Sequence, residues 1–374
     1  GFCMLSYRKL AMRVLGRPLH TGDSGSPRPA SQRAAAFILT AIMLTSLTAP
    51  AFAKTWCIED GNITVKAGDT GNDVTQKGET TYGDTDTIIT NQNKDIASSN
   101  TVTIETNDKN DKVEVTLKDV NINVGSDSGS ALTSNGDVTL TLKGDNSLTG
   151  GNGGSGISSN GSLTITGGEN DSLTAKGGSG RSGIFSSGGV TISGGTVTAT
   201  GGKSGSGDYS NGGNGISSSG SLSISGGTVT ATAGSSSGSY GRDGITTSSS
   251  LTISGGTVTA NGGSGSYRGG SGISSSDIEL SGSLELTAKA GSPNGKALSQ
   301  NGIELDPNTF KEKLDPGANI ITKDADGKVI DQVSSPRPVE PEGPVIPEES
   351  SSSSDSGSST PSADGGSATP SAPA

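Results

Sequence analysis

Apolar and polar residues alternate in short segments that recur through the middle of the chain, each bounded by glycine or serine. Alternation with a period of two is typical of β-strands, because successive side chains of a strand point to opposite faces. In one repeat the segments read GISSS, SLSIS and TVTAT. The pattern therefore predicts three short strands per repeat.

One face of these strands forms the predicted core. In the repeat that begins at Ile216, the inner face carries Ile216, Ser218, Leu222, Ile224, Val229 and Ala231. The outer face of its third strand carries Thr228, Thr230 and Thr232. The next repeat has the same inner pattern, with Ile245, Thr247, Leu251, Ile253, Val258 and Ala260. We expect equivalent residues to stack as ladders, because a single coil buries too little to fold alone.

The motif Gly-Ile-Ser-Ser sets the length of the repeat. Its anchors are Ile157, Ile184, Ile216, Ile245 and Ile273, with weaker copies at Ala131 and Ala297. Adjacent anchors are separated by 26, 27, 32, 29, 28 and 24 residues, which is typical of a solenoid with loops of different length. We expect an all-β fold, a parallel β-helix over residues 101–305, with coils about 4.8 Å apart. Glycine pairs such as Gly255–Gly256 turn its corners.

The segment before the repeats has the pattern of a secretory signal peptide. Arg28 and Arg33 precede a short apolar run at 34–47, and the small residues of the sequence AFA end at Ala53. A basic region, a short apolar stretch and a small-x-small ending predict cleavage after Ala53, so that residues 1–53 are removed. The alternative is a membrane anchor, but the run is short and rich in threonine. We expect a secreted or cell-surface protein.

The remaining segments differ from the repeats. Residues 54–100 are polar and rich in Thr and Asp, and are expected to cap the β-helix at its N-terminal end, with strands in NITVKAG and DTIIT. Residues 306–333 form the expected C-terminal cap, with a helical turn in PNTFKEKL and a hairpin that turns at Asp326–Gly327. Residues 334–374 are rich in Ser and Pro and are expected to be a disordered linker.

The composition agrees with a narrow repetitive core. Glycine makes up 61 of the 374 residues, aromatic residues 3% and hydrophobic residues 28%, which is little apolar material for an ordinary globular core. The formal net charge is -11, and it becomes -16 once residues 1–53 are removed with their six basic residues and one acidic residue. Such a charge argues against nucleic acid and anionic membrane surfaces as partners.

Little in the sequence indicates an enzyme. The one histidine, His20, lies in the segment that we expect to be removed, which excludes His-dependent nucleophilic catalysis in the mature chain. Asp277, Glu279 and Glu285 form at most a weak acidic triad for a glycosidase, and a solvated outer face is the simpler interpretation. We expect no catalytic residues, with a polysaccharide lyase or glycoside hydrolase as the alternative. Cys57 is expected to be a free thiol after cleavage.

The candidate binding residues lie in the loops that follow the third strand. Three tyrosines occur there, 7, 5 and 6 residues before their anchors, and charged residues accompany them or lie in the equivalent loop of an earlier coil. Aromatic rings pack against sugar faces, while Arg and Asp hydrogen-bond hydroxyl groups or, for Arg, uronate carboxylates. The alternative is that each tyrosine covers its own glycine-rich loop. The proposed ligand-binding residues are Tyr209, Tyr240, Tyr267, Arg181, Arg242, Arg268, Asp208 and Asp243.

Repeats such as VTISGGTVTATGG, which follow the segment NITVKAGDTGNDVTQ, resemble secreted carbohydrate-binding β-helix proteins of Gram-positive, often gut-dwelling, bacteria. These proteins are relatives of the pectate-lyase-like superfamily, and the resemblance covers residues 58–333. It implies a right-handed parallel β-helix at the cell surface that binds plant or host polysaccharide. Calcium is implied by this resemblance for some members only; no acidic cluster matches a calcium site here, and we expect no metal or other cofactor.

These observations favour an exported, non-catalytic, carbohydrate-binding or adhesive β-helix whose partner is a polysaccharide, with uronate-containing polysaccharides among the candidates. A purely structural stalk or spacer is the main alternative. A remote alternative is ice binding, because flat arrays of threonine on a β-helix resemble ice-binding surfaces, although threonine is also simply a good exposed strand residue. The array comprises Thr196, Thr198, Thr200, Thr228, Thr230, Thr232, Thr257 and Thr259.

Overall fold

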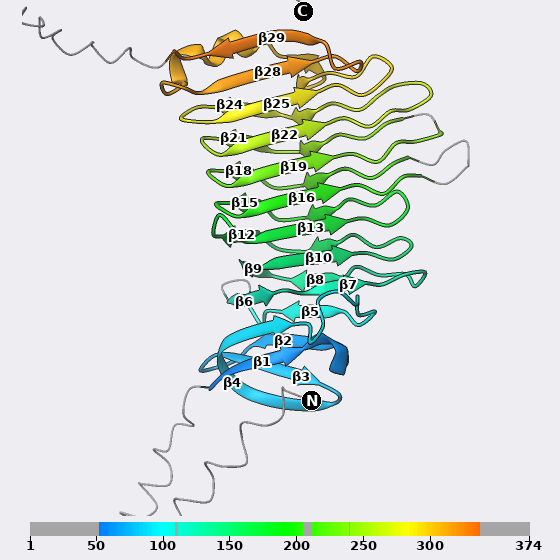
Figure 1. The fold of residues 1–374 in the computed structure, drawn as a ribbon, viewed down its shortest axis with the longest axis vertical. Helices are drawn as coiled ribbons and strands as arrows, with labels where there is room; N and C mark the ends of the chain where they lie inside the picture. The colour runs from blue at the N-terminus through cyan, green and yellow to red at the C-terminus, as the bar shows by residue number, and fades with distance from the viewer. Residues whose placement is uncertain (1–51, 109–110, 205–210, 239, 337–374) are drawn as a thin grey trace, which may run out of the picture. The chain divides into compact units, whose positions relative to one another are not determined.

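The computed structural model describes residues 52–108, 111–204, 211–238 and 240–336. Within these ranges the chain forms a parallel β-helix of about seven turns, as the repeat predicted (Figure 1). The predicted signal peptide, apart from its last two residues, and nearly all of the expected linker lie outside the described residues. Among the described residues, no helix is long and apolar enough to span a membrane.

The strands stack in three columns, and each strand pairs in parallel with its equivalents in the neighbouring coils. The first column begins at the anchor residues and contains β2 (Ile63–Ala67), β5 (Val102–Glu105), β8 (Leu132–Asn135), β11 (Ile157–Ser159), β14 (Ile184–Ser186), β17 (Ile216–Ser218), β20 (Ile245–Thr247), β23 (Ile273–Ser275) and β26 (Leu298–Gln300).

The second and third columns complete each coil. The second contains β4 (Glu79–Thr90), β6 (Lys112–Lys118), β9 (Asp137–Lys143), β12 (Leu163–Gly167), β15 (Val190–Ile192), β18 (Leu222–Ile224), β21 (Ser250–Ile253) and β24 (Asp277–Leu280). The third contains β7 (Asn121–Asn123), β10 (Asp145–Thr149), β13 (Ser172–Lys176), β16 (Thr196–Thr200), β19 (Thr228–Thr232), β22 (Thr257–Asn261), β25 (Glu285–Lys289) and β28 (Asn319–Lys323).

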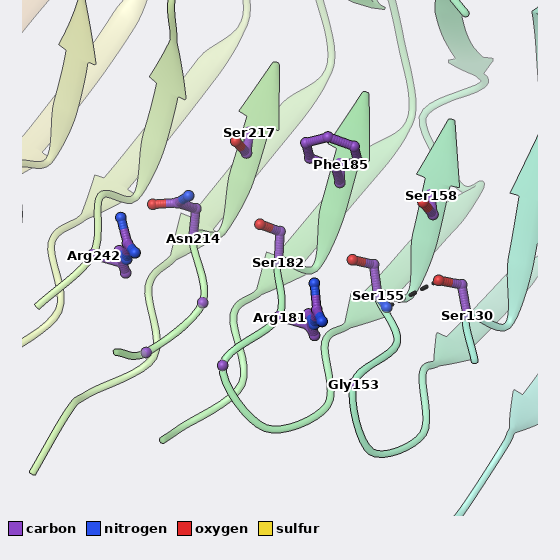
Figure 2. A pocket seen from close by; sticks show the side chains of 13 residues that line it. Ser130, Gly153, Ser155, Ser158, Arg181, Ser182, Phe185, Asn214, Ser217 and Arg242 are labelled. Carbon is purple, nitrogen blue, oxygen red and sulfur yellow. Dashed lines mark hydrogen bonds between the residues drawn. The ribbon is translucent and has the colours of Figure 1, made fainter. Parts of the chain in front are cut away.

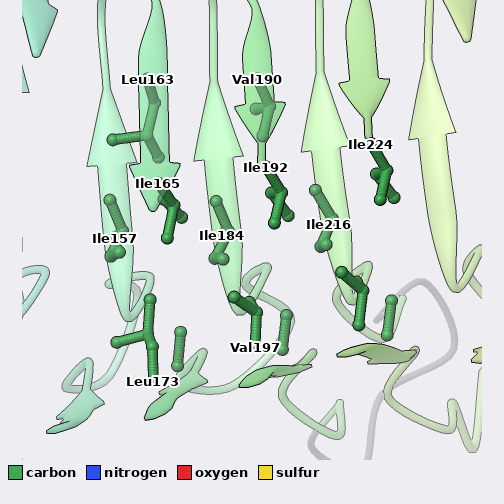
Figure 3. Close-up of a cluster of buried hydrophobic side chains, with 14 of the residues drawn as sticks. Ile157, Leu163, Ile165, Leu173, Ile184, Val190, Ile192, Val197, Ile216 and Ile224 are labelled. Atoms are coloured by element: carbon green, nitrogen blue, oxygen red, sulfur yellow. The ribbon is translucent and has the colours of Figure 1, made fainter. Parts of the chain in front are cut away.

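The predicted inner face is the core of the β-helix. Ile157, Ile184 and Ile216 lie in register on neighbouring strands and are fully buried, and the other two columns add their own apolar ladders (Figure 3). Burying an aliphatic side chain of this size stabilises a fold by roughly 1.5–3 kcal/mol. Stacking therefore gives each coil a core that it lacks alone.

The register of the outer anchors differs from the sequence alignment by one residue. Leu132 and Leu298, not Ala131 and Ala297, pair with the anchor isoleucines. The two alanines occupy the place that glycine holds before Ile157 and Ile273, and both are fully buried. The predicted anchors were wrong there because the alanine before each strand was matched to the isoleucine that begins the strand in the other repeats.

The loops that follow the third column close at a neck made of backbone hydrogen bonds. The amide of Gly202 donates to the carbonyl oxygen of Arg181 at 2.8 Å, and the amide of Gly213 donates to the oxygen of Gly202 at 2.8 Å. A Cβ on Gly202 would overlap the carbonyl oxygen of Gly178 in the preceding coil. The repeated glycine at this point of the loop is thus required by close backbone approach.

The two ends of the β-helix have different structures. At the C-terminal end, the 3₁₀ helix η2 (Pro307–Lys313) and the antiparallel pair of β28 with β29 (Val329–Ser334) confirm the expected helical turn and hairpin. A two-residue strand, β27 (Ile303–Glu304), pairs with β26. At the N-terminal end, β2 pairs in parallel with β5, so the first column continues into residues 54–100.

The first strands of the chain complete the N-terminal end. Strand β1 (Phe52–Cys57) pairs in parallel with β4 and is followed by the 3₁₀ turn η1 (Ile58–Asp60), while β3 (Asn72–Gln76) pairs in antiparallel fashion with β2 and β4. Cys57 is buried and disulfide-bonded in the full chain; a free thiol was expected only after cleavage, and that stays a prediction. The other cysteine of the sequence, Cys3, lies outside the described residues.

Candidate functional site

Two rows of side chains run along the outer side of the first column, and Ser155, Ser271 and Ser299 within them are buried. The strand row consists of the residue after each anchor, which points away from the core because the strand alternates: Ser158, Phe185, Ser217, Thr246, Ser274 and Ser299. The edge row lies two residues before each anchor, where the loop enters the strand: Ser130, Ser155, Ser182, Asn214, Asp243 and Ser271.

The edge row is held together by hydrogen bonds between coils. The amide of Ser155 donates to Oγ of Ser130 at 3.0 Å, and the amide of Asp243 donates to Oδ1 of Asn214 at 2.9 Å. The amide of Ser271 donates to Oδ1 of Asp243 at 2.6 Å. Several of these side chains therefore fix the position of the next loop as well as lining the surface.

Arg181 and Arg242 lie beside these rows and line one cavity of about 320 Å³. Both precede their anchors by three residues, and Gly213 holds the same place in the coil between them. A Cβ on Gly213 would overlap the carbonyl oxygen of Arg181, so the intervening coil has no side chain there. We call this surface the arginine groove; its polar lining comes from Ser130, Ser155, Ser158, Ser182, Asn214 and Ser217.

The two arginines of the groove are exposed and separated by two coil spacings, about 10 Å of stack height. Among the described residues, neither forms an ion pair within 4.0 Å. Figure 2 shows them on the loop side of the edge row, with Asn214 and Ser182 between them. Their guanidinium groups are thus free to donate hydrogen bonds to a ligand.

Phe185 is the residue of the groove that sequence reasoning missed. It lies half-buried on β14, in the strand row between Ser158 and Ser217 (Figure 2). The neighbouring coils have serine at this position, so its ring is an apolar surface in an otherwise polar cavity. The signal was visible in the sequence GIFSS, where the other full repeats have Ser or Thr after the anchor isoleucine.

A second cavity of about 310 Å³ continues along the same rows. It shares Arg242 with the arginine groove and is also lined by Tyr240, Asp243, Arg268 and Ser274. Four of the predicted ligand-binding residues therefore meet at one place. Arg181 does not line this cavity; it lines the first one together with Arg242.

Two of the three predicted tyrosines are in contact. The rings of Tyr240 and Tyr267 pack edge to face, with centroids 5.7 Å apart and planes at 72°. The side chains remain 48% and 72% exposed, which leaves both rings accessible to a ligand. Backbone pairing between Tyr240 and Arg268 brings the two loops together. Tyr209 and Asp208 lie outside the described residues.

Asp243 has a structural contact that its loop position did not predict. Burial raises the pKa of its carboxyl group above the ordinary value of 3.8, although hydrogen bonds from Ser271 and Thr246 and the charge of Arg242 act in the opposite direction. Its carboxylate accepts a hydrogen bond from the amide of Ser271, so Asp243 holds the loop of the next coil in place. Removing the charge of Asp243 is therefore expected to change the stability of the fold as well as the affinity for any ligand.

The weak acidic triad is divided between two columns. Asp277 and Glu279 lie on β24, whereas Glu285 lies on β25 across the corner of the coil. Lys313 pairs with Glu279 at 2.7 Å, which ties that carboxylate to the C-terminal cap. In the described part of the chain, no group of three His, Cys, Asp or Glu residues is placed to hold a metal. Calcium remains an implication of the resemblance alone.

The threonine array forms outward rows in register on the third column. Thr198, Thr230 and Thr259 pair across neighbouring strands, as do Thr196, Thr228 and Thr257. Thr228 and Thr257 are exposed, and the other threonines of the array are half-buried. Ice binding stays a hypothesis for this face.

Comparisons with protein-family models, with curated proteins and with solved structures find no match to this chain.

Proposed function

We propose that this protein is an exported, non-catalytic, polysaccharide-binding β-helix and that the sugar chain lies in the arginine groove. The observation that carries the proposal is one half-buried aromatic ring, Phe185, which lines the same cavity as two arginines without ion pairs; hydroxyl and amide groups make up the rest of the lining. No other strand-row position from Ser158 to Ser299 has an aromatic residue.

Each part of the groove matches a property of sugars. The face of a pyranose ring is apolar and packs against an aromatic ring, with an energy of about 0.5–1.5 kcal/mol beyond area burial for aromatic pairs of similar size. Arginine donates paired hydrogen bonds to a carboxylate or to neighbouring hydroxyl groups. The serine and asparagine side chains supply further donors and acceptors. A ligand that contains uronate satisfies the arginines best.

The orientation of the groove favours a polymer over a single sugar. Both cavities follow the stack direction of the coils and meet at Arg242, so an extended chain can pass from Phe185 towards Tyr240. The exposed edge-to-face pair of Tyr240 and Tyr267 offers a second aromatic surface there. Because the rows are built on stacked strands, little ordering of the protein is required on binding.

The test is calorimetric titration of the protein with oligosaccharides from neutral, uronate-containing and sulfated polysaccharides. Phe185→Ser introduces the residue that neighbouring coils have at this position, so the fold is preserved and affinity is expected to fall about tenfold, which corresponds to 1.4 kcal/mol. Arg181→Ala and Arg242→Ala are each expected to weaken binding of a uronate ligand by a similar factor and to reduce its salt dependence.

Lys289→Ala, on the third column, is the matched control and is expected to leave the affinity unchanged. Wild-type affinity in Phe185→Ser and in both arginine variants would exclude the arginine groove as the site. A protein that binds no glycan would be a structural spacer instead, and release of unsaturated or reducing ends from the polysaccharides would identify a lyase or hydrolase.

A further inference from the structure

Asp84 is a fully buried carboxylate in the N-terminal coil, on β4. It accepts hydrogen bonds from the indole Nε1 of Trp56 at 2.8 Å, from the backbone amide of Lys54 at 3.1 Å and from the amide of Asp86 at 3.4 Å. Among the described residues, no cation lies within 4.0 Å of it. A buried charge without a countercharge is costly and uncommon in proteins.

The nearby lysine side chain does not supply the missing charge. The Nζ atom of Lys54 lies 3.6 Å from the centroid of the Trp56 ring, where the ring stabilises it, and it forms no ion pair with Asp84 within 4.0 Å. The atom of Lys54 that donates to Asp84 is its backbone nitrogen. In the uncut chain this nitrogen is a neutral amide.

The sequence predicts cleavage of the peptide bond between Ala53 and Lys54, to which this nitrogen belongs. The small-x-small ending at Ala53 places the cut between Ala53 and Lys54, which makes Lys54 the first residue of the mature chain. Pairing of β1 with β4 is regular from Ala53 to Cys57 and breaks between Phe52 and Ala53. Cleavage therefore leaves Lys54–Cys57 paired with Thr87–Thr90.

We propose that the bond between Ala53 and Lys54 is a processing site and that the α-ammonium group released there is the countercharge of Asp84. A signal-peptidase-type endopeptidase hydrolyses the bond: water adds its hydroxyl group to the carbonyl carbon of Ala53, and Lys54 leaves as an α-amine. The amine takes up one more proton from solvent, since α-amino groups titrate near pH 8.

The consequence is a first coil whose stability depends on processing. The new ammonium group arises at an atom that is already 3.1 Å from Oδ1 of Asp84, so no rearrangement is needed. A hydrogen bond between two charged groups is about twice as strong as one with a neutral amide. The first coil contains the paired strands β1 and β4 (Figure 1), and it thus gains the charged hydrogen bond to Asp84 only in the cut chain. This inference does not depend on the ligand of the groove.

The first experiment identifies the mature end. The full chain is exported from a bacterial host and its N-terminus is determined by intact mass and sequential degradation, with Lys54 expected. The α-amine of the folded protein is then treated with an acylating reagent near pH 7. An ion pair with the buried carboxylate of Asp84 is expected to slow its reaction at least tenfold relative to the protein in urea.

The second experiment measures stability. Exported chain is compared with uncut chain made in the cytosol, both under reducing conditions so that Cys57 is in the same state. The cut form is expected to have a Tm higher by about 2–4 °C, and Asp84→Asn is expected to abolish this difference. If Asp84→Asn does not fold, the acylation rate of the wild-type α-amine tests the ion pair instead. A different N-terminus, a fully reactive α-amine or equal Tm values would overturn the proposal.

Discussion

At the residue scale, the positions that cannot change are set by neighbouring coils and not by the local strand. Glycine at the loop neck is required because the carbonyl oxygen of the previous coil occupies the space of a side chain, as at Gly202 and Gly213. Phe185, Arg181 and Arg242 are the opposite case: they occupy outward places where the scaffold imposes no residue. Scaffold and candidate site can thus be distinguished residue by residue.

Asp243 gives a prediction at this scale. Because burial raises the pKa of Asp243, its carboxyl group binds a proton more tightly in the folded protein than in the unfolded chain. The free energy of unfolding therefore falls as the pH rises from the ordinary value of 3.8 through the folded pKa. Asp243→Asn retains an oxygen for the amide of Ser271, and Asn214 shows that asparagine fits the equivalent place. The variant is expected to have a higher Tm than the wild type at pH 7.

Thermal unfolding of both proteins from pH 7 to pH 3 checks this prediction. The difference in Tm is expected to shrink as the pH falls through the folded pKa of Asp243, because the wild-type carboxyl group then becomes neutral too. A difference that grows on acidification would show that the charge of Asp243 stabilises the fold.

At the element scale, buried hydroxyl groups connect the first strand of several coils to the following corner. The hydroxyl of Ser186 lies within hydrogen-bonding distance of the carbonyl oxygens of Gly161, in the preceding coil, at 2.8 Å and of Gly189, in its own coil, at 3.1 Å. Ser134 has the same place in an earlier coil and is equally buried, but its Oγ atom lacks a partner among the described residues. The same residue type is therefore satisfied in one coil and unsatisfied in another.

Alanine substitution of the two serines is expected to have unequal effects. Ser186→Ala removes a made hydrogen bond and is expected to lower the free energy of unfolding by about 1 kcal/mol. Ser134→Ala removes a buried polar atom that makes none, and is expected to be neutral or stabilising. Urea unfolding of the two variants measures both values, and equal losses would contradict the assigned hydrogen bonds.

At the scale of the whole molecule, stability is a sum over neighbouring coils, since each coil contacts only the ones before and after it. The coil from Ile245 to Gly272 pairs through β20, β21 and β22 with equivalent strands on both sides. The strands that would meet after its removal have nearly the same inner residues. Whole coils are therefore exchangeable units.

Deletion of residues 245–272 tests this view. The shortened chain is expected to fold with an unchanged circular dichroism spectrum per residue and to unfold in one transition. The arginine groove is retained, because Arg181, Phe185 and Arg242 lie outside the deletion, so affinity for a short oligosaccharide is expected to persist. A long polysaccharide is expected to bind more weakly, because Tyr267 and Arg268 are lost. Collapse of the fold would contradict nearest-neighbour stability.

The sequence by itself determined the β-helix, its inner and outer faces and the C-terminal turn and hairpin, because alternation and repeat spacing act locally and identically in every coil. It also selected Arg181, Tyr240 and Arg242 as residues of loops. Only the tertiary structure decided the register at Leu132 and Leu298, the shared cavity of Phe185 with Arg181 and Arg242, and the contact of Asp84 with Lys54. Stacking brings these residues together across tens of positions in the chain, and no local pattern encodes such distances.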